Sequence, residues 1–164
     1  MSKRLLVFLG VGLVIASIVV ALIYYTHVGS HLELKGEIVK IRTGEIDKQN
    51  CAAVIDFRVE NTSDVQFLVR RIVVTAEHPG GEQTEGESIS RSGIKQLLEY
   101  NRFFGKQYNP GLAARDQIKP REKMDRTIAV RFDIPLEQLD KAKQLRLYIQ
   151  DVNGTEFETV KPLK

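Results

Sequence analysis

The 164-residue sequence has no tryptophan and one cysteine, Cys51. A single cysteine excludes an internal disulfide framework and any zinc or iron–sulfur site built from several cysteines. Proline and glycine are also modest, at 5 and 12 residues, which excludes a collagen and a low-complexity linker. With 43% hydrophobic and 27% charged residues, the chain has the composition of a folded protein, and its length suits one domain or one domain with an appendage.

The sequence also lacks any long cluster of positive charge. Lysine and arginine total 24 and aspartate and glutamate total 21, but Lys3 and Arg4 precede a stretch that carries no charge until Glu33. Without those two residues the balance is 22 basic against 21 acidic. The basic pI of about 9.0 therefore gives no indication of nucleic-acid binding, and we expect no nucleic-acid partner.

Residues 5–25 form an uncharged apolar run of 21 residues. As a helix it spans about 32 Å, close to the ~30 Å hydrocarbon core of a bilayer. With Lys3 and Arg4 on one side, the positive-inside rule predicts a cytoplasmic N-terminus (1–4), a transmembrane helix (5–25), a tether (26–31) and an extracytoplasmic domain (32–164), periplasmic or extracellular. A cleaved signal peptide is the alternative, but its apolar region is shorter, about 7–15 residues, and ends in small residues.

Small residues recur along this predicted span at Gly12, Ala16, Ser17 and Ala21. Such spacings let two membrane helices approach closely. Because they are also common in single spans, a homodimer formed through this helix stays an alternative to a monomer.

Beyond residue 31, alternation of apolar and polar residues predicts strands with one buried face. Gly36 marks a phase shift of the kind that a bulge allows. Asn153-Gly154 predicts a hairpin turn with positive φ at both residues. Asp56 falls on a polar strand face and is expected in solvent. The predicted strands cover residues 32–41, 51–59, 66–76, 84–90, 128–134 and 145–149, with another at Phe157.

One segment has a helical period instead. Ile94, Leu97, Leu98 and Phe104 share a helical face, Ser92 is placed to cap the first turn, and Gly105 to end the helix. A second, short helical turn is predicted over 135–142. The predicted fold is therefore mainly β: an antiparallel immunoglobulin-like β-sandwich with one inserted short helix, preceded by the transmembrane helix. A small barrel is the alternative.

Two stretches resemble a known family. The sequence Ile55-Asp-Phe-Arg-Val-Glu-Asn-Thr-Ser63 and the sequence from Ile118-Lys-Pro-Arg to Pro135 are similar to parts of late embryogenesis abundant type 2 (water-stress and hypersensitive-response) domains. Immunoglobulin-like domains of bacterial surface lipoproteins have a comparable piece. The chain departs from the pattern at Thr62, where the family usually has proline. The resemblance implies a sandwich with a binding or stress-linked role and no catalytic residues.

Residues suited to chemistry are few and scattered. His27 and His31 have no acidic or thiol ligand nearby, so we expect no metal, and we expect no cofactor. Cys51 shares the apolar strand face and is expected to be a small buried hydrophobe, while His78 is expected in a turn. The glycosylation sequons at Asn61 and Asn153 are interpreted as turn residues. These observations favour a protein that is not an enzyme.

Aromatic and basic residues are interleaved near the predicted helix. Tyr100, Arg102, Phe103 and Tyr108 are candidates for a protein-interaction surface, because aromatics mixed with arginine are common at interfaces. Phe104, in contrast, is expected to cover an open end of the sandwich. The predicted function is a single-pass membrane-anchored module for protein binding or envelope assembly. The alternatives are a sandwich that binds lipid or a small molecule, and an enzyme.

Overall fold

The computed structural model describes residues 12–22 and 33–163. The chain divides into two compact units, Met1–His31 and Leu32–Lys164. In the first unit, residues 12–22 form a helix whose side chains are all exposed. Among the described residues, no helix has both the length and the apolar character needed to cross a bilayer. The predicted cytoplasmic segment 1–4, the tether 26–31, and residues 5–11 and 23–25 of the predicted span lie outside the described residues.

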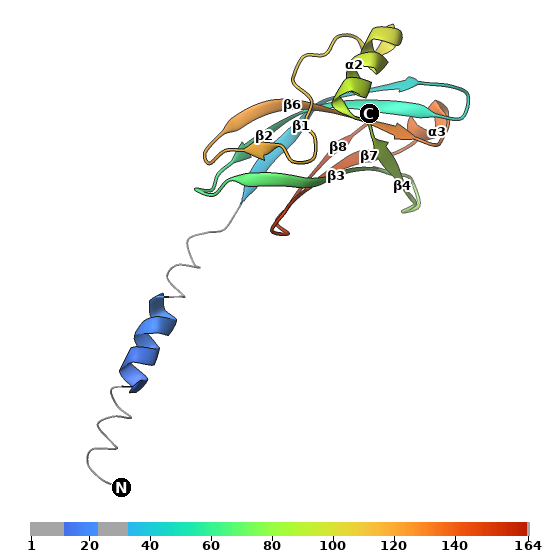
Figure 1. Cartoon of the computed structure of the whole chain (residues 1–164). Helices are drawn as coiled ribbons and strands as arrows, with labels where there is room; N and C mark the ends of the chain where they lie inside the picture. The colour runs from blue at the N-terminus through green and yellow to red at the C-terminus, as the bar shows by residue number, and fades with distance from the viewer. Residues whose placement is uncertain (1–11, 23–32, 164) are drawn as a thin grey trace, which may run out of the picture. The chain divides into compact units, whose positions relative to one another are not determined.

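The second unit is an antiparallel assembly of strands in two layers (Figure 1). One layer contains β1, β2 and β6, and the other contains β3, β7 and β8. The bounds are β1 (Leu34–Glu45), β2 (Cys51–Asn61), β3 (Phe67–Glu77), β4 (Gln83–Ser88), β5 (Gln117–Ile118), β6 (Lys123–Phe132), β7 (Gln144–Asp151) and β8 (Glu156–Pro162).

Strand β4 joins the two layers. Its first residues pair with β3, whereas Glu87 and Ser88 pair with β6. The resulting strand order is β1-β2-β6-β4-β3-β7-β8, with β5 beside β3. The predicted antiparallel, mainly-β sandwich is thus confirmed in a form close to a barrel. The polar composition of residues 84–90 predicts a strand at the edge of a sheet, but this prediction is wrong, because β4 lies between β6 and β3 in the strand order.

A lysine bridges the first and last strands of this order. The register of β1 shifts between Ile38 and Lys40, and Lys161 of β8 donates to the carbonyls of Ile38 and Val39 at 3.0 and 2.6 Å. The predicted bulge at Gly36 is therefore misplaced by three residues. Gly36 is required for another reason, since a Cβ there would lie 2.2 Å from the carbonyl oxygen of Arg58.

Strand β2 is buried on both faces. Its odd-numbered residues enter the main core between the layers, together with large side chains such as Phe67 and Phe132. Its even-numbered residues Ala52 and Val54 pack in a second cluster outside the layer, with Ile94, Leu98, Phe104 and Ala129. The prediction that Asp56 is solvated is wrong for this reason: the inserted helical segment covers that face and leaves Asp56 5% exposed.

A bulge also changes the face of β3. The register shifts between Val69 and Arg71, so Phe67 and Val69 enter the core before the shift, and Val74 and Ala76 enter it afterwards. A single alternation through the predicted strand 66–76 predicts that Leu68 shares the buried face of Val74 and Ala76, but Leu68 is only half-buried. One extra residue reverses the side-chain direction, which a strict period of two does not predict.

The predicted helix forms but is shorter and breaks once. α2 (Arg91–Tyr100) is capped by Ser90, whose hydroxyl accepts from the amide of Gly93, so the expected cap at Ser92 is wrong by two residues. A 3-10 turn, η1 (Arg102–Phe104), follows and ends at Gly105 with φ 71°. The second predicted helical turn is confirmed as α3 (Leu136–Leu139).

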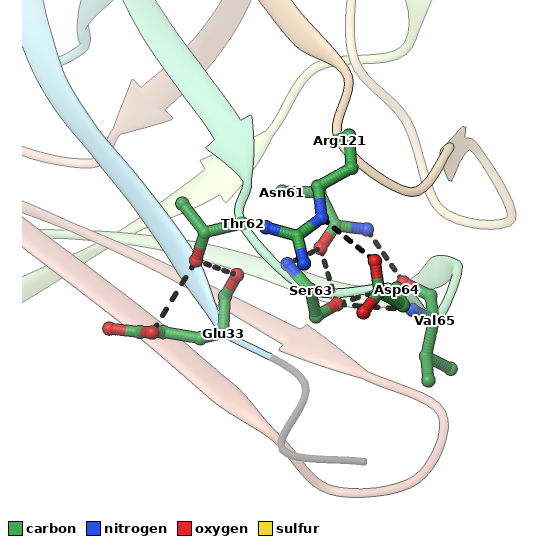
Figure 2. Close-up of polar contacts among 7 residues, drawn as sticks. All are labelled: Glu33, Asn61, Thr62, Ser63, Asp64, Val65 and Arg121. Carbon is green, nitrogen blue, oxygen red and sulfur yellow. Dashed lines mark hydrogen bonds and ion pairs between the residues drawn. The ribbon is translucent and has the colours of Figure 1, made fainter. Parts of the chain in front are cut away.

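The turn between β2 and β3 is organised around Asn61 (Figure 2). The fully buried Asn61 donates to the carbonyls of Val65 and Ile118 at 2.8 and 3.2 Å. Its side-chain oxygen accepts from the amide of Ser63 at 3.0 Å and from the Ser63 hydroxyl at 2.6 Å. Because these contacts use the whole amide group, the interpretation of this sequon as a turn is confirmed.

The hairpin between β7 and β8 is confirmed, with a different turn. Gly154 has φ 91°, but Asn153 has no positive φ. The amide of Gly154 donates to the carbonyl of Asp151, and that of Asp151 to the carbonyl of Thr155. This is a three-residue loop with glycine in the left-handed position, and the buried Asp151 carboxylate fixes it by accepting from the amides of Asn153 and Leu68.

Candidate protein-interaction surface

The candidate surface is built on the segment that connects β4 to β5. In this segment, α2 turns one face toward the outer side of the layer containing β2 and β6 (Figure 1). Ile94, Leu98 and Phe104 occupy that face and are buried. Ile89, one residue before the cap, packs in the same cluster as Ile94, which is the position of a hydrophobic staple.

A buried ion pair holds the end of this segment against β1. The Nη2 atom of Arg42 lies 2.8 Å from the Oδ2 atom of Asp56, and the two side chains are 9% and 7% exposed. The guanidinium also donates to the carbonyls of Phe104 and Lys106, the latter at 2.9 Å. The hydroxyl of Thr127 donates to the other oxygen of Asp56. Arg42 therefore satisfies carbonyls of the 3-10 turn and of the loop that follows it.

Neighbouring phenylalanines have opposite environments at this point. Phe104 is fully buried, whereas Phe103 is 91% exposed and Tyr100 is 88% exposed. The expectation that Phe104 acts as a cover is confirmed, although it covers the outer face of a layer rather than an open end of the sandwich. The segment is thus anchored by Phe104 and presents Phe103 and Tyr100 to solvent.

Three of the four predicted residues line one groove. Tyr100, Arg102 and Phe103 border an open groove of about 860 Å³, and Tyr108 does not. Tyr108 is 66% exposed and lies over β1, with its ring 5.3 Å from the Arg42 guanidinium and 5.9 Å from the Lys40 ammonium. The complete lining is Ile46, Ile89, Gly93, Gln96, Leu97, Tyr100, Asn101, Arg102 and Phe103.

Sequence reasoning missed Ile46 and Ile89 as part of this groove. Ile46 follows β1 in a polar loop and is 42% exposed, and its amide donates to the carbonyl of Asn50. Asp47 shapes that loop by accepting from the amides of Gln49 and Asn50 and from the Asn50 side chain. These hydrogen bonds, led by that from Gln49, lower the pKa of Asp47. The sequence signal that could have identified Ile46 as a groove residue is an apolar side chain isolated in a polar turn.

Asn101 joins the groove to the end of β1. Its backbone amide donates to the carbonyl of Leu97 and ends α2, while its side-chain oxygen accepts from the amide of Phe103. The side-chain nitrogen donates to the carbonyl of Glu45 at 2.8 Å. One asparagine therefore positions the exposed turn relative to the sheet.

Two other predicted residues have the expected surroundings. Cys51 is fully buried, and this burial, helped by the charge of Asp140, raises the pKa of its thiol to about 11. His78 flanks the turn between β3 and β4, where its ring lies 3.1 Å from the hydroxyl of Thr84. In the ranges 12–22 and 33–163, no group of three His, Cys, Asp or Glu residues is arranged to hold a metal. His27 and His31 lie outside these ranges.

Two solved structures are distantly similar to this chain. An uncharacterised β-sandwich protein from Clostridium difficile 630 is 14% identical, with 80% of this chain and 81% of that chain covered and a TM-score of 0.35. Northeast Structural Genomics Consortium target SoR45 is 13% identical, with coverages of 80% and 82% and a TM-score of 0.32. No family model and no curated protein matches the chain. The sandwich assignment rests on the strand pairing itself, and membership of the late embryogenesis abundant family is not shown.

Proposed function

We propose that this chain is a single-pass membrane protein whose extracytoplasmic β-sandwich binds another protein, in a binding or envelope-assembly role without catalysis of its own. The observation that carries the proposal is the pair of exposed aromatics, Tyr100 and Phe103, beside the buried anchor Phe104. Exposing two large aromatic side chains to water is unfavourable, whereas both are favoured at the centre of protein interfaces.

The membrane anchor is supported by the first unit of the chain. Residues 5–25 carry no charge, and the helix of residues 12–22 has only exposed side chains, most of them large and apolar. We propose that this helix extends through the predicted span, with residues 1–4 in the cytoplasm and the sandwich on the other side. The resemblance to late embryogenesis abundant type 2 domains agrees with a binding role.

The lipid-binding alternative requires an apolar cavity between the two layers. That region holds close-packed core side chains, including Phe57, Phe67 and Phe132, which are fully buried. The exposed surface on the inserted segment therefore has the stronger support.

The test is site-specific photo-crosslinking of the full chain in its native membranes. A photoreactive phenylalanine analogue replaces Phe103, and in a control it replaces Val160, which is 44% exposed on β8. We expect a discrete protein adduct from position 103 and none from position 160. Equal yields at both positions, or no adduct at either, would contradict a protein-binding surface here. Extraction with alkaline carbonate tests the anchor, because an integral protein stays in the membrane pellet.

A further inference from the structure

We infer that the partner enters the groove of Ile46, Leu97, Tyr100, Arg102 and Phe103 with an acidic peptide segment that carries a large apolar side chain. This inference rests on the proposed function and adds the chemistry of the ligand. The apolar requirement follows from the lining, in which the isoleucine, leucine and aromatic side chains form the walls and Arg102 is the charged residue.

The acidic requirement follows from the distribution of charge. Residues 32–164 carry 22 basic and 21 acidic residues, so the sandwich as a whole is close to neutral. Residues 91–111 depart from this balance, with four basic residues and one acidic residue, Glu99. The inserted segment is therefore a positive region on a domain that is otherwise slightly negative.

Two of these charges are available to a ligand. Arg91 is paired with Asp116, and Lys95 lies 3.8 Å from Glu99. Arg102 and Lys106 are exposed, and neither makes an ion pair with another part of the chain that the structure describes. Arginine beside aromatic rings binds carboxylates through paired hydrogen bonds and is common in interface hot spots.

The groove lies at one end of strand β1. Strand β1 begins at Leu34, close to the predicted tether, and ends at Glu45, whose carbonyl accepts from Asn101 in the groove. The 11 steps between Leu34 and Glu45 correspond to about 36 Å of extended strand. The groove is thus at the end of β1 opposite to Leu34, and its exposed aromatics beside an arginine that is unpaired among the described residues favour a peptide as its ligand.

The inference is tested by peptide selection on the full chain in phosphatidylcholine nanodiscs. A library of random 12-residue peptides is selected, and an enriched peptide is measured by fluorescence anisotropy. We expect enriched sequences with Asp or Glu near Leu, Ile or Phe, and weaker binding at high salt. Phe103→Ala and Arg102→Glu should each weaken binding about tenfold or more. Arg70→Glu makes the same charge change on β3, at an exposed arginine outside the groove, and should leave affinity within about twofold.

Three results would overturn the inference. The first is enrichment of no peptide, or of peptides without acidic residues. The second is an equal effect of Arg102→Glu and Arg70→Glu. The third is that the groove binds phosphatidylglycerol vesicles, or that sedimentation shows it binding a second copy of the chain. This result counts if Phe103→Ala abolishes that binding and the selected peptides do not compete with it. If one of these results is found but photo-crosslinking gives a protein adduct from position 103, only the inference about the ligand is wrong. If photo-crosslinking gives no adduct, the proposed function is wrong as well.

Discussion

The adjacent residues Phe103 and Phe104 allow the division between anchor and surface to be measured. Phe104 is fully buried against the outer face of β2 and β6, so Phe104→Ala removes a complete aromatic side chain and leaves a cavity. Such changes cost about 3–5 kcal/mol. For a domain of this size the loss corresponds to a decrease in melting temperature of roughly 10–15 °C. Phe103→Ala changes a side chain that is 91% exposed and should alter the free energy of unfolding by no more than about 0.5 kcal/mol.

Gly44 provides an independent check on the position of the Phe104 ring. A Cβ at Gly44 would lie 2.7 Å from the ring, and its three nearest neighbours are all ring atoms of Phe104. Gly44→Ala should therefore cost about 1–3 kcal/mol in the wild-type chain. In a Phe104→Ala background the obstructing ring is gone, so the same change should cost clearly less.

Thermal unfolding of the full chain in detergent micelles, followed by circular dichroism in the strand region, measures the wild type and all four variants. Phe103→Ala serves as the matched control for Phe104→Ala. The assignment would be refuted if the two variants lost similar stability. A fully additive double variant of Gly44 and Phe104 would refute the packing of the ring over Gly44.

Three further predictions concern buried or paired groups. Asn61→Ala should lower the free energy of unfolding, measured in urea, by about 2–4 kcal/mol, because it leaves buried carbonyls without donors. The control Asn153→Ala, at an exposed turn, should change it by about 0.5 kcal/mol or less. Similar losses in the two variants would contradict the role of Asn61. Cys51 should react with a thiol reagent at pH 8 only after unfolding, since the raised pKa keeps the buried thiol protonated. The free energy of unfolding should decrease as pH rises from 9.0, the ordinary pKa of a cysteine, toward the folded value of about 11. Fast labelling of the native chain would show that the site is open. Hydrogen bonds from Gln144 and Arg146 lower the pKa of Glu77, so the contribution of this carboxylate to stability is complete above the ordinary pKa of 4.5 and is lost as pH falls through the lower folded value. The difference in unfolding free energy between wild type and Glu77→Gln should therefore shrink between about pH 6 and about pH 3. A constant difference would exclude this linkage.

The strands could be predicted because a strand with one buried face has alternating apolar and polar residues, and this alternation can be recognised locally in the sequence. The errors arose where another part of the chain changed that local rule. Asp56 has the sequence position of a solvated residue, but the segment around Phe104 covers it and Arg42 compensates its charge. Leu68 has the wrong face because a bulge at Val69 reverses the phase.

The candidate surface was predictable in composition but not in geometry. The cluster of Tyr100, Arg102 and Phe103 could be recognised because aromatics and arginine are close together in the sequence. The separation of Tyr108 from the groove depends on its contacts with Lys40 and Arg42, which are more than 60 residues away. The contribution of Ile46 depends likewise on the pairing of Asn101 with the end of β1.

The lysine between β8 and β1 has a consequence for behaviour at high local concentration. An open strand edge with free carbonyls is a template on which another copy can add a strand and begin an aggregate. Lys161 occupies the carbonyls of Ile38 and Val39, so an incoming strand would have to displace an ammonium group and place its own backbone beside that charge. The ammonium group of Lys161 therefore makes edge-to-edge strand addition unfavourable at this point of β1.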